Sequence, residues 1–186
     1  MKLQRYAGLL ILTLAISAHA ATLEGKVSGS NAVVYVDAIP GKTFPAPARP
    51  VVISQRGLAF VPHIVVIQQG TTVDFQNDDS VQHNVFWPSI GGNKKDAHNM
   101  GTWPKGDKRP FKFDHPGIVP LLCNVHAEMS GYIVVSPTPY FAQADSGGNF
   151  KIDNIPDGKY TIVAWHEGSK PERKLVDLNG NGHIDF

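Results

Sequence analysis

One short segment concentrates the residues of this chain best suited to binding a metal ion. Cys123, His126 and Met129 place a thiol, an imidazole and a thioether at every third position, between two apolar stretches. A tight loop between two strands can curl so that the three side chains converge on one point. Thiolate and thioether are soft ligands, and a trigonal set of two His and one Cys with a weak axial Met is typical of copper sites that transfer electrons. The spacing therefore predicts a copper site.

A site of this kind requires a second histidine, and His83 is the best candidate. It lies between a predicted strand end with its turn, Phe75 to Ser80, and a predicted strand start, Asn84 to Trp87. Taken singly, Met129 would more often be a core residue and His83 a hydrogen-bonded or surface histidine. Structural zinc fits less well, because such sites favour more cysteines and do not use Met. Other histidines have no paired spacing that singles them out as ligands; they are His63, His98, His115, His166 and His183.

The N-terminus predicts export. Lys2 and Arg5 precede an apolar run from Ala7 to Ile16, and Ala18-His19-Ala20 fits a small-x-small cleavage site, so residues 1–20 are interpreted as a signal peptide and the periplasm as the destination. The run is shorter than the ~20 residues that a spanning helix needs, so an uncleaved anchor is the less favoured alternative.

The chain has a single cysteine, Cys123, and this excludes a framework of intrachain disulfide bonds.

Composition limits the remaining possibilities. A chain of 186 residues holds two small domains at most, since domains run to about 100–200 residues. With 42% hydrophobic and 18% charged residues it can bury a core, and 18 Gly with 14 Pro indicate many turns, which excludes disorder and coiled coil. The formal charge of +1, without a stripe of Lys and Arg, makes nucleic acid an unexpected partner.

Short strand signals dominate the chain and predict an all-β sandwich or barrel. The predicted strands are Ala32 to Asp37, Val51 to Gln55, His63 to Gln68, Thr71 to Gln76, Asn84 to Trp87, Pro110 to Asp114, Ile118 to Cys123, Tyr132 to Ser136, Asn149 to Ile152, Tyr160 to Trp165 and Leu175 to Leu178. The stretch from Pro88 to Lys108 is predicted to be a long loop.

The ligand loop and its surroundings resemble the cupredoxins, most closely those of the amicyanin and pseudoazurin type, over about residues 51 to 136. Further landmarks are Phe60-Val61-Pro62, Val73-Asp74-Phe75-Gln76-Asn77, His83-Asn84-Val85-Phe86 and Gly131-Tyr132-Ile133-Val134-Val135. The resemblance implies a Greek-key β-sandwich and one type 1 copper ion. It makes His83, Cys123, His126 and Met129 the ligands, and Asn84 the residue that hydrogen-bonds to the ligand loop and steadies the thiolate.

The loop departs from the amicyanin pattern at two positions. Ala127 and Glu128 stand where such loops usually carry Pro and an aromatic or aliphatic residue. The loop is therefore expected to be less rigid. A carboxylate beside the copper would favour the oxidised ion and lower the potential, although an exposed charge is screened.

The flanking segments resemble a second family, the carboxypeptidase regulatory-like (prealbumin-like) modules. The resemblance rests on Gly25-Lys26-Val27, Asn31 to Val36, Ala144 to Ile152 and Ile155 to Thr161. The whole arrangement is similar to exported plastocyanin-like proteins labelled as methylamine utilisation proteins. It implies a cupredoxin domain at residues 48–136 inserted into a small β-sandwich of residues 22–47 with 137–186. The alternative is that residues 22–40 add an edge strand to the cupredoxin sheet.

These features together predict an exported carrier of single electrons and no enzyme. Its expected partner is a redox protein, a cytochrome or a dehydrogenase, and the mature chain is expected to be a monomer without a membrane span. Copper trafficking or storage at the same site is the alternative; an enzyme would need further ligands or a catalytic dyad.

Two further features carry less weight. A group of basic residues could dock an acidic partner or be merely solvated: Lys94, Lys95, Lys105, Lys108 and Arg109. Asp177 to Asp185 resembles part of a calcium loop, but suits a hairpin turn equally well.

Overall fold

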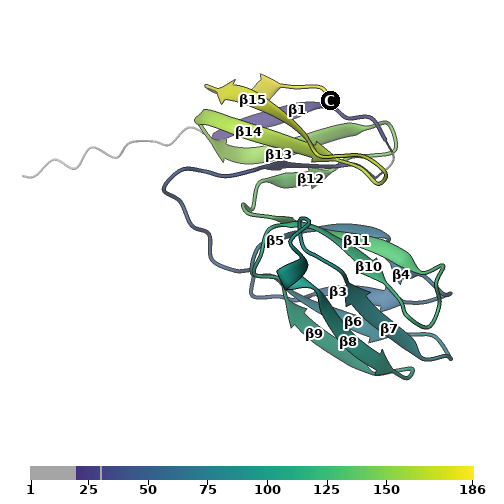
Figure 1. Cartoon of the computed structure of the whole chain (residues 1–186). Coiled ribbons are helices and arrows are strands. Elements are labelled where there is room, and N and C mark those ends of the chain that lie inside the picture. Colours follow the sequence, from purple (N-terminus) through teal and green to yellow (C-terminus); the bar gives the residue numbers. More distant parts are fainter. Residues whose placement is uncertain (1–19, 30) are drawn as a thin grey trace, which may run out of the picture.

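The computed structural model describes residues 20–29 and 31–186 (Figure 1). Regular structure in this part of the chain is β-strand apart from one 3-10 turn, η1 (Lys94–Asp96), and this confirms the all-β fold class. The predicted signal peptide, except for Ala20, lies outside the described residues. No helix among the residues described is long and apolar enough to cross a membrane.

The middle of the chain forms a five-stranded and a four-stranded sheet, here called the middle sandwich (residues 51–136). The five-stranded sheet has the order β5 (Ile64–Gln68), β11 (Ser130–Ser136), β10 (Gly117–Leu122), β7 (His83–Trp87) and β8 (His98–Trp103). The four-stranded sheet has the order β4 (Phe60–Val61), β3 (Val51–Gln55), β6 (Thr72–Asn77) and β9 (Lys108–Lys112). Buried side chains from both sheets form one apolar cluster that also contains Cys123 and Met129.

Burial along the strands follows from how many of their faces are covered. In β10 the buried Val119 and Leu121 alternate with half-buried neighbours, as expected for a strand with one face on the core. In β11 the residues from Ile133 to Ser136 are all buried. The second face of β11 is therefore covered as well, by segments of the chain outside residues 51–136.

The N-terminal strands pair with strands that follow the middle sandwich, and together they form the second sandwich (residues 20–36 with 141–183). Its three-stranded sheet has the order β13 (Asn149–Pro156), β1 (Ala20–Lys26) and β16 (Gly182–His183). Its four-stranded sheet has the order β12 (Phe141–Gln143), β2 (Val33–Val36), β14 (Gly158–Trp165) and β15 (Glu172–Leu178). These strands enclose a second apolar cluster. This pairing supports an inserted domain, whose boundaries stay a prediction, and gives no support to an edge strand from residues 22–40 in the middle sheets.

A third, smaller cluster joins the two sandwiches. Val134 and Ile64 pack with Trp165, Val163 and other buried residues of the second sandwich. The ring of Tyr132 lies 5.2 Å from that of Trp165. The outer face of β11 and β5 is thus covered by the second sandwich, as the arrangement in Figure 1 shows.

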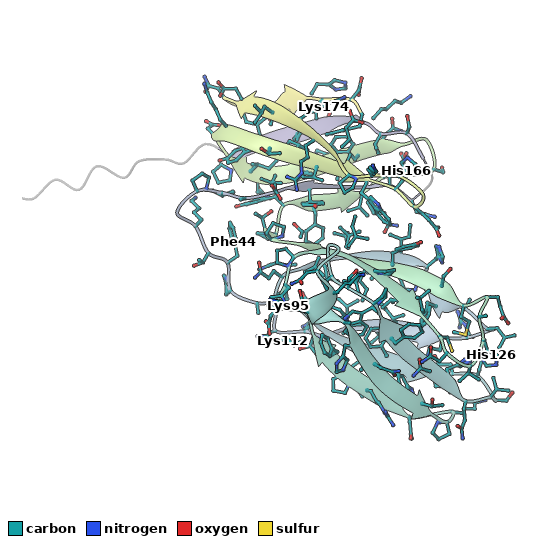
Figure 2. All side chains as sticks on the ribbon, viewed as in Figure 1. Phe44, Lys95, Lys112, His126, His166 and Lys174 are labelled. Carbon is teal, nitrogen blue, oxygen red and sulfur yellow. The ribbon has the colours of Figure 1, made fainter. Side chains whose placement is uncertain are left out.

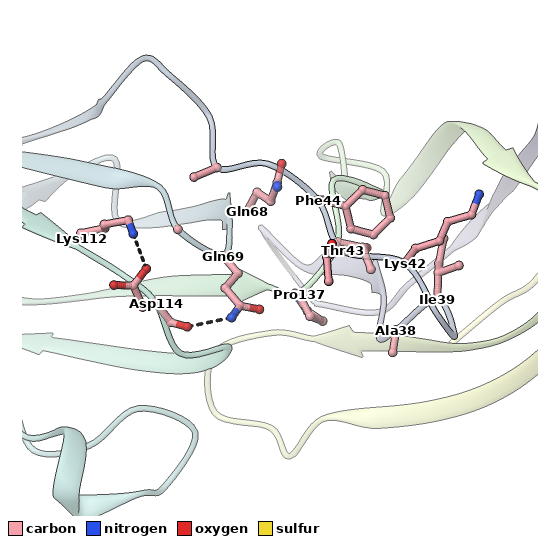
Figure 3. Close-up of a pocket in the computed structure, with 13 residues that line it drawn as sticks. Ala38, Ile39, Lys42, Thr43, Phe44, Gln68, Gln69, Lys112, Asp114 and Pro137 are labelled. Atoms are coloured by element: carbon pink, nitrogen blue, oxygen red, sulfur yellow. Dashed lines mark hydrogen bonds and ion pairs between the residues drawn. The ribbon is translucent and has the colours of Figure 1, made fainter.

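The segment between β2 and β3 crosses from one sandwich to the other. Gln68 Nε2 donates to the Pro45 carbonyl at 2.9 Å, and the ring of Phe44 meets that of Tyr140 edge-on at 5.7 Å. Figure 3 shows the pocket beneath this segment, where Gln69 donates to the Asp114 carbonyl and Lys112 pairs with the Asp114 carboxylate. The Gln68–Pro45 hydrogen bond and the Phe44–Tyr140 contact tie the crossing segment to residues outside it.

The predicted long loop from Pro88 to Lys108 is wrong over part of its length. It contains η1 and β8, and β9 already begins at Lys108. Strand β8 pairs with β7 through a register shift between Asn84 and Phe86. Most of its side chains are exposed or half-buried, so its sequence lacks the alternation that marks a strand. The short strands β4, β12 and β16 also escape prediction, because two or three residues carry no pattern.

Gly25 is expected to be essential for packing the C-terminal end of the chain. A Cβ at this position would lie 1.7 Å from the Ile184 carbonyl oxygen. The Ile184 amide donates to the Glu24 carbonyl at 3.0 Å and the Phe186 amide to that of Lys26 at 2.8 Å. Gly25→Ala should break this pairing at an overpacking cost of about 1–3 kcal/mol. Amide hydrogen exchange at Ile184 and Phe186 measures the loss; unchanged exchange, equal to that of a Glu24→Ala control, would contradict it.

Candidate metal centre

The β10–β11 connection forms a tight loop at one end of the middle sandwich, where Figure 2 labels His126. The strands are paired up to Leu122 and Ser130, so the loop between them is closed at its base. Within it the Met129 amide donates to the His126 carbonyl at 3.1 Å. The chain therefore turns back on itself within the segment that carries the predicted ligands.

The loop brings Cys123 and His126 against His83, the first residue of β7. One ligand atom from each of these three residues lies within 4.8 Å of the other two. The Nδ1 atoms of His83 and His126 are 3.1 Å apart, and their ring planes are inclined at 63°. In the described part of the chain this is the one group of three His, Cys, Asp or Glu side chains close enough to share an ion.

Three of the four predicted ligands are buried and the fourth is partly exposed. The side chains of His83, Cys123 and Met129 belong to buried residues, with exposed fractions of 0%, 5% and 1%. His126 is half-buried. An ion held between these residues would therefore be shielded from water, except along the edge of His126. The role of Met129 as fourth ligand stays a prediction, which its place in the same buried cluster as Cys123 supports.

Asn84 fixes the ligand loop from the neighbouring strand. Its backbone amide donates to Cys123 Sγ at 3.4 Å, and its side-chain oxygen accepts from the Asn124 amide at 3.2 Å. Its side-chain Nδ2 donates to Asn99 Oδ1 and to the Gly101 carbonyl, both at 2.8 Å. Asn84 thus connects β7, β8 and the ligand loop and directs an N–H group at the sulfur.

Asp79 contacts the site, although the sequence does not single it out. Its Oδ2 lies 2.8 Å from His83 Nε2, and its carboxylate accepts from the backbone amides of Gly57 at 2.7 Å and Leu58 at 3.0 Å. The two backbone donors, assisted by His83, lower the pKa of Asp79 to about 2. An Asp in the polar turn Asn77-Asp78-Asp79-Ser80 is common for turn geometry alone; its position four residues before His83 was the signal available.

Three further histidines have carboxylate partners away from the site. His63 Nε2 lies 2.8 Å from Glu167, His115 Nδ1 lies 2.7 Å from Asp96, and His183 Nε2 lies 3.0 Å from Asp185. The His63 pair spans the two sandwiches. None of the three belongs to the described group of candidate ligands.

The stretch from Asp177 to Asp185 uses its side chains to bind β1. Asn181 Oδ1 accepts from the Thr22 amide at 3.1 Å, and Asp185 Oδ1 accepts from the Lys26 amide at 2.7 Å. The hairpin-turn alternative is wrong, because β15 pairs with β14 in one sheet and β16 pairs with β1 in the other, so the stretch links two sheets.

Comparison with known proteins gives one family match. Residues 49–136 match the model of the copper binding proteins, plastocyanin/azurin family. A search of curated proteins finds no match.

Solved structures similar to this chain include three copper-related proteins. A Cu-containing nitrite reductase from Thermus scotoductus SA-01 is 25% identical, with a TM-score of 0.44 over 54% of this chain and 25% of that one. A purple cupredoxin from Nitrosopumilus maritimus is 26% identical, with a TM-score of 0.41 over 46% of this chain and 99% of that one. A point mutant of amicyanin in its reduced state is 19% identical, with a TM-score of 0.44 over 55% of this chain and 98% of that one. This chain thus spans about a quarter of the nitrite reductase.

The donor atoms themselves fit copper, because one thiol and two imidazoles converge within 4.8 Å beside a buried thioether. The resemblance of the flanking segments to regulatory-like modules stays a prediction. The family match supports a cupredoxin domain of the plastocyanin/azurin family at residues 49–136, with copper as its cofactor and His83, Cys123 and His126 as its candidate type 1 site.

Proposed function

We propose that this protein carries single electrons between redox partners in the periplasm, through one type 1 copper held by His83, Cys123, His126 and Met129. The observation that carries the proposal is the convergence of three donor atoms within 4.8 Å, on residues of which only His126 is not fully buried. When bound, copper supplies a one-electron couple between Cu(II) and Cu(I).

The residues around the site hold the ligands in one arrangement. Asn84 bonds to both Cys123 and Asn124, and the closed base of the loop fixes its two ends. Because the ligands are held by the sandwich, they need to move little when the charge of the ion changes. Small movement favours rapid electron transfer, and the buried cluster beneath the site excludes water.

This rigidity distinguishes the electron carrier from its alternative, copper trafficking or storage. A protein that delivers copper needs ligands that a receiving protein can reach. Here His83, Cys123 and Met129 are buried and only His126 is accessible in part. We also propose that the protein turns over no substrate, since four ligands leave no open position on the ion.

The edge of His126 is the proposed exit for the electron. Several large apolar side chains are exposed in the ligand loop, in the β6–β7 turn, at the β3–β4 hairpin tip and in β4. Their exposed fractions are 49% for Val125, 43% for Val81, 42% for Leu58 and 36% for Val61. An apolar rim of this kind, with small Ala127 beside His126, suits transient docking of a redox protein, whose complexes bury little surface. The proposed partner is a cytochrome or a dehydrogenase, and the protein is proposed to act as a monomer.

A charge placed on this rim should slow electron transfer. Val125→Glu puts an uncompensated carboxylate beside His126, where a docking partner would have to desolvate it. We expect the second-order rate with a soluble c-type cytochrome, measured by stopped-flow absorbance, to fall by about tenfold, the equivalent of about 1.4 kcal/mol. A variant with Lys94→Gln and Lys95→Gln is the control and should keep the wild-type rate. The docking face is misplaced if the control is slowed and Val125→Glu is not.

A further inference from the structure

The carboxylate of Asp79 joins a predicted copper ligand to a hairpin that carries no ligand. Asp79 lies in the turn between β6 and β7, four residues before His83. Its Oδ2 is 2.8 Å from His83 Nε2 and 3.0 Å from the Leu58 amide, while its Oδ1 accepts from the Gly57 amide at 2.7 Å. Gly57 and Leu58 form the tip of the β3–β4 hairpin.

The contact with Nε2 decides which nitrogen of His83 is free to bind a metal. An ionised carboxylate can only accept hydrogen bonds, so Nε2 of His83 must carry the proton in this pair. The other ring nitrogen, Nδ1, is then left with a free lone pair. Nδ1 is also the atom that lies 3.1 Å from Nδ1 of His126, on the side of the ligand group. The hydrogen bond and the metal-binding geometry therefore require the same tautomer.

The contacts with the hairpin tip hold an unfavourable backbone conformation. Leu58 has a φ of 57°, a left-handed conformation that non-glycine residues adopt at a cost. Its side chain is 42% exposed, so the packing of its side chain offers little compensation. The carboxylate of Asp79 binds the amides of both tip residues, and these bonds stabilise the turn.

We propose that Asp79 is a positioning residue for the metal site: it fixes the Nε2–H tautomer and the ring orientation of His83 and anchors both to the β3–β4 hairpin tip. This inference rests on the proposed function in so far as it treats His83 as a copper ligand. Carboxylates that orient a ligating histidine in this way strengthen metal binding, and their loss typically costs about 10- to 100-fold in affinity.

Asp78 provides a matched control. It is the neighbouring Asp of the same turn, and its carboxylate accepts from Ser54 Oγ at 2.5 Å and from Gln76 Nε2 at 2.7 Å. Asp78→Ala removes a turn carboxylate with comparable hydrogen bonds and leaves the bond between Asp79 and His83 in place. Effects seen with Asp79→Ala and not with Asp78→Ala therefore arise from the His83 contact or the hairpin tip.

The tautomer is read in the copper-free protein, by ¹⁵N chemical shifts of the His83 ring. Wild type and Asp78→Ala should show His83 protonated on Nε2, whereas Asp79→Ala should show a mixture with the Nδ1–H tautomer. Amide hydrogen exchange at Gly57 and Leu58 should quicken in Asp79→Ala alone. Asp79→Asn keeps the size of the side chain but has one acceptor oxygen in place of two, so it should give an intermediate result and serves if Asp79→Ala does not fold.

Copper affinity supplies the second readout. Competition with a chelator of known affinity should show Asp79→Ala binding copper about 10- to 100-fold more weakly than wild type, with Asp78→Ala unchanged. The proposal is overturned if His83 keeps the Nε2–H tautomer in the Asp79 variants and affinity stays within about twofold of wild type. A wild-type protein without a thiolate-to-copper band would instead refute the proposed function. The tautomer measurement in the copper-free protein would still show whether Asp79 fixes the Nε2–H tautomer of His83.

Discussion

Cys123→Ser is expected to abolish the intense visible absorption of the copper-loaded protein. That absorption arises from charge transfer between a thiolate and Cu(II), and Cys123 is the single cysteine of the chain. Its sulfur is buried among the candidate ligands, so no other residue can replace it. Titration with Cu(II), followed from the visible to the near infrared, measures the effect as the loss of the whole band.

Met129→Leu is the matched control for this experiment. It removes a sulfur from the same loop at similar volume, but Met is expected to be a weak axial ligand, so the band should persist with altered position or intensity. Colour that survives in Cys123→Ser would refute the type 1 assignment, because a copper ion without a bound thiolate has no such transition.

Deletion of residues 22–40 should unfold the second sandwich and leave the copper site intact. This deletion removes β2 and nearly all of β1, and both are interior strands of their sheets. Strand β1 lies between β13 and β16, and β2 lies between β12 and β14. Without them neither sheet is continuous, and the apolar cluster that includes Leu23 and Val34 loses one side. The predicted copper ligands all lie in the middle sandwich, whose own cluster contains none of the deleted residues.

Limited proteolysis of the deleted and intact chains, with the visible band recorded in parallel, checks this result. Rapid cleavage within residues 137–186 with full colour is expected. A C-terminal segment that stays resistant while the colour is lost would show that the N-terminal strands belong to the cupredoxin, and would contradict the proposed domain division.

The sequence predicted most of the longer strands, with β1 and β8 as exceptions. β3 was predicted to the residue, and the loop of Cys123, His126 and Met129 was expected between the strands that now flank it. Ligands that lie in one short loop between paired strands can be recognised from their spacing, because the loop itself brings them together. The approach of His83 to His126 depends on sheet packing. The sequence singled out His83 by its place between two predicted strands, and the resemblance to the cupredoxins agreed with that choice.

The missed features depend on contacts between distant segments. β8 has few buried side chains, so its pairing with β7 left no hydrophobic pattern. The junction of the two sandwiches was also not predicted, because Tyr132 and Trp165 look like ordinary strand residues until their sheets are placed together. The one signal for Asp79 in the sequence is its position four residues before His83, and a turn-forming aspartate can have the same position.

The most direct test of a single-electron carrier is the visible spectrum of the protein with one equivalent of Cu(II), recorded through one cycle of chemical reduction and reoxidation in the presence of a Cu(I) chelator. The proposed function predicts an intense thiolate-to-copper band that disappears with one electron per protein and returns at full amplitude, because the buried ligands retain the ion in both states. A colourless copper complex would contradict the type 1 site at His83, Cys123 and His126. A band that fails to return because the chelator has taken the copper would contradict the electron carrier in favour of copper delivery.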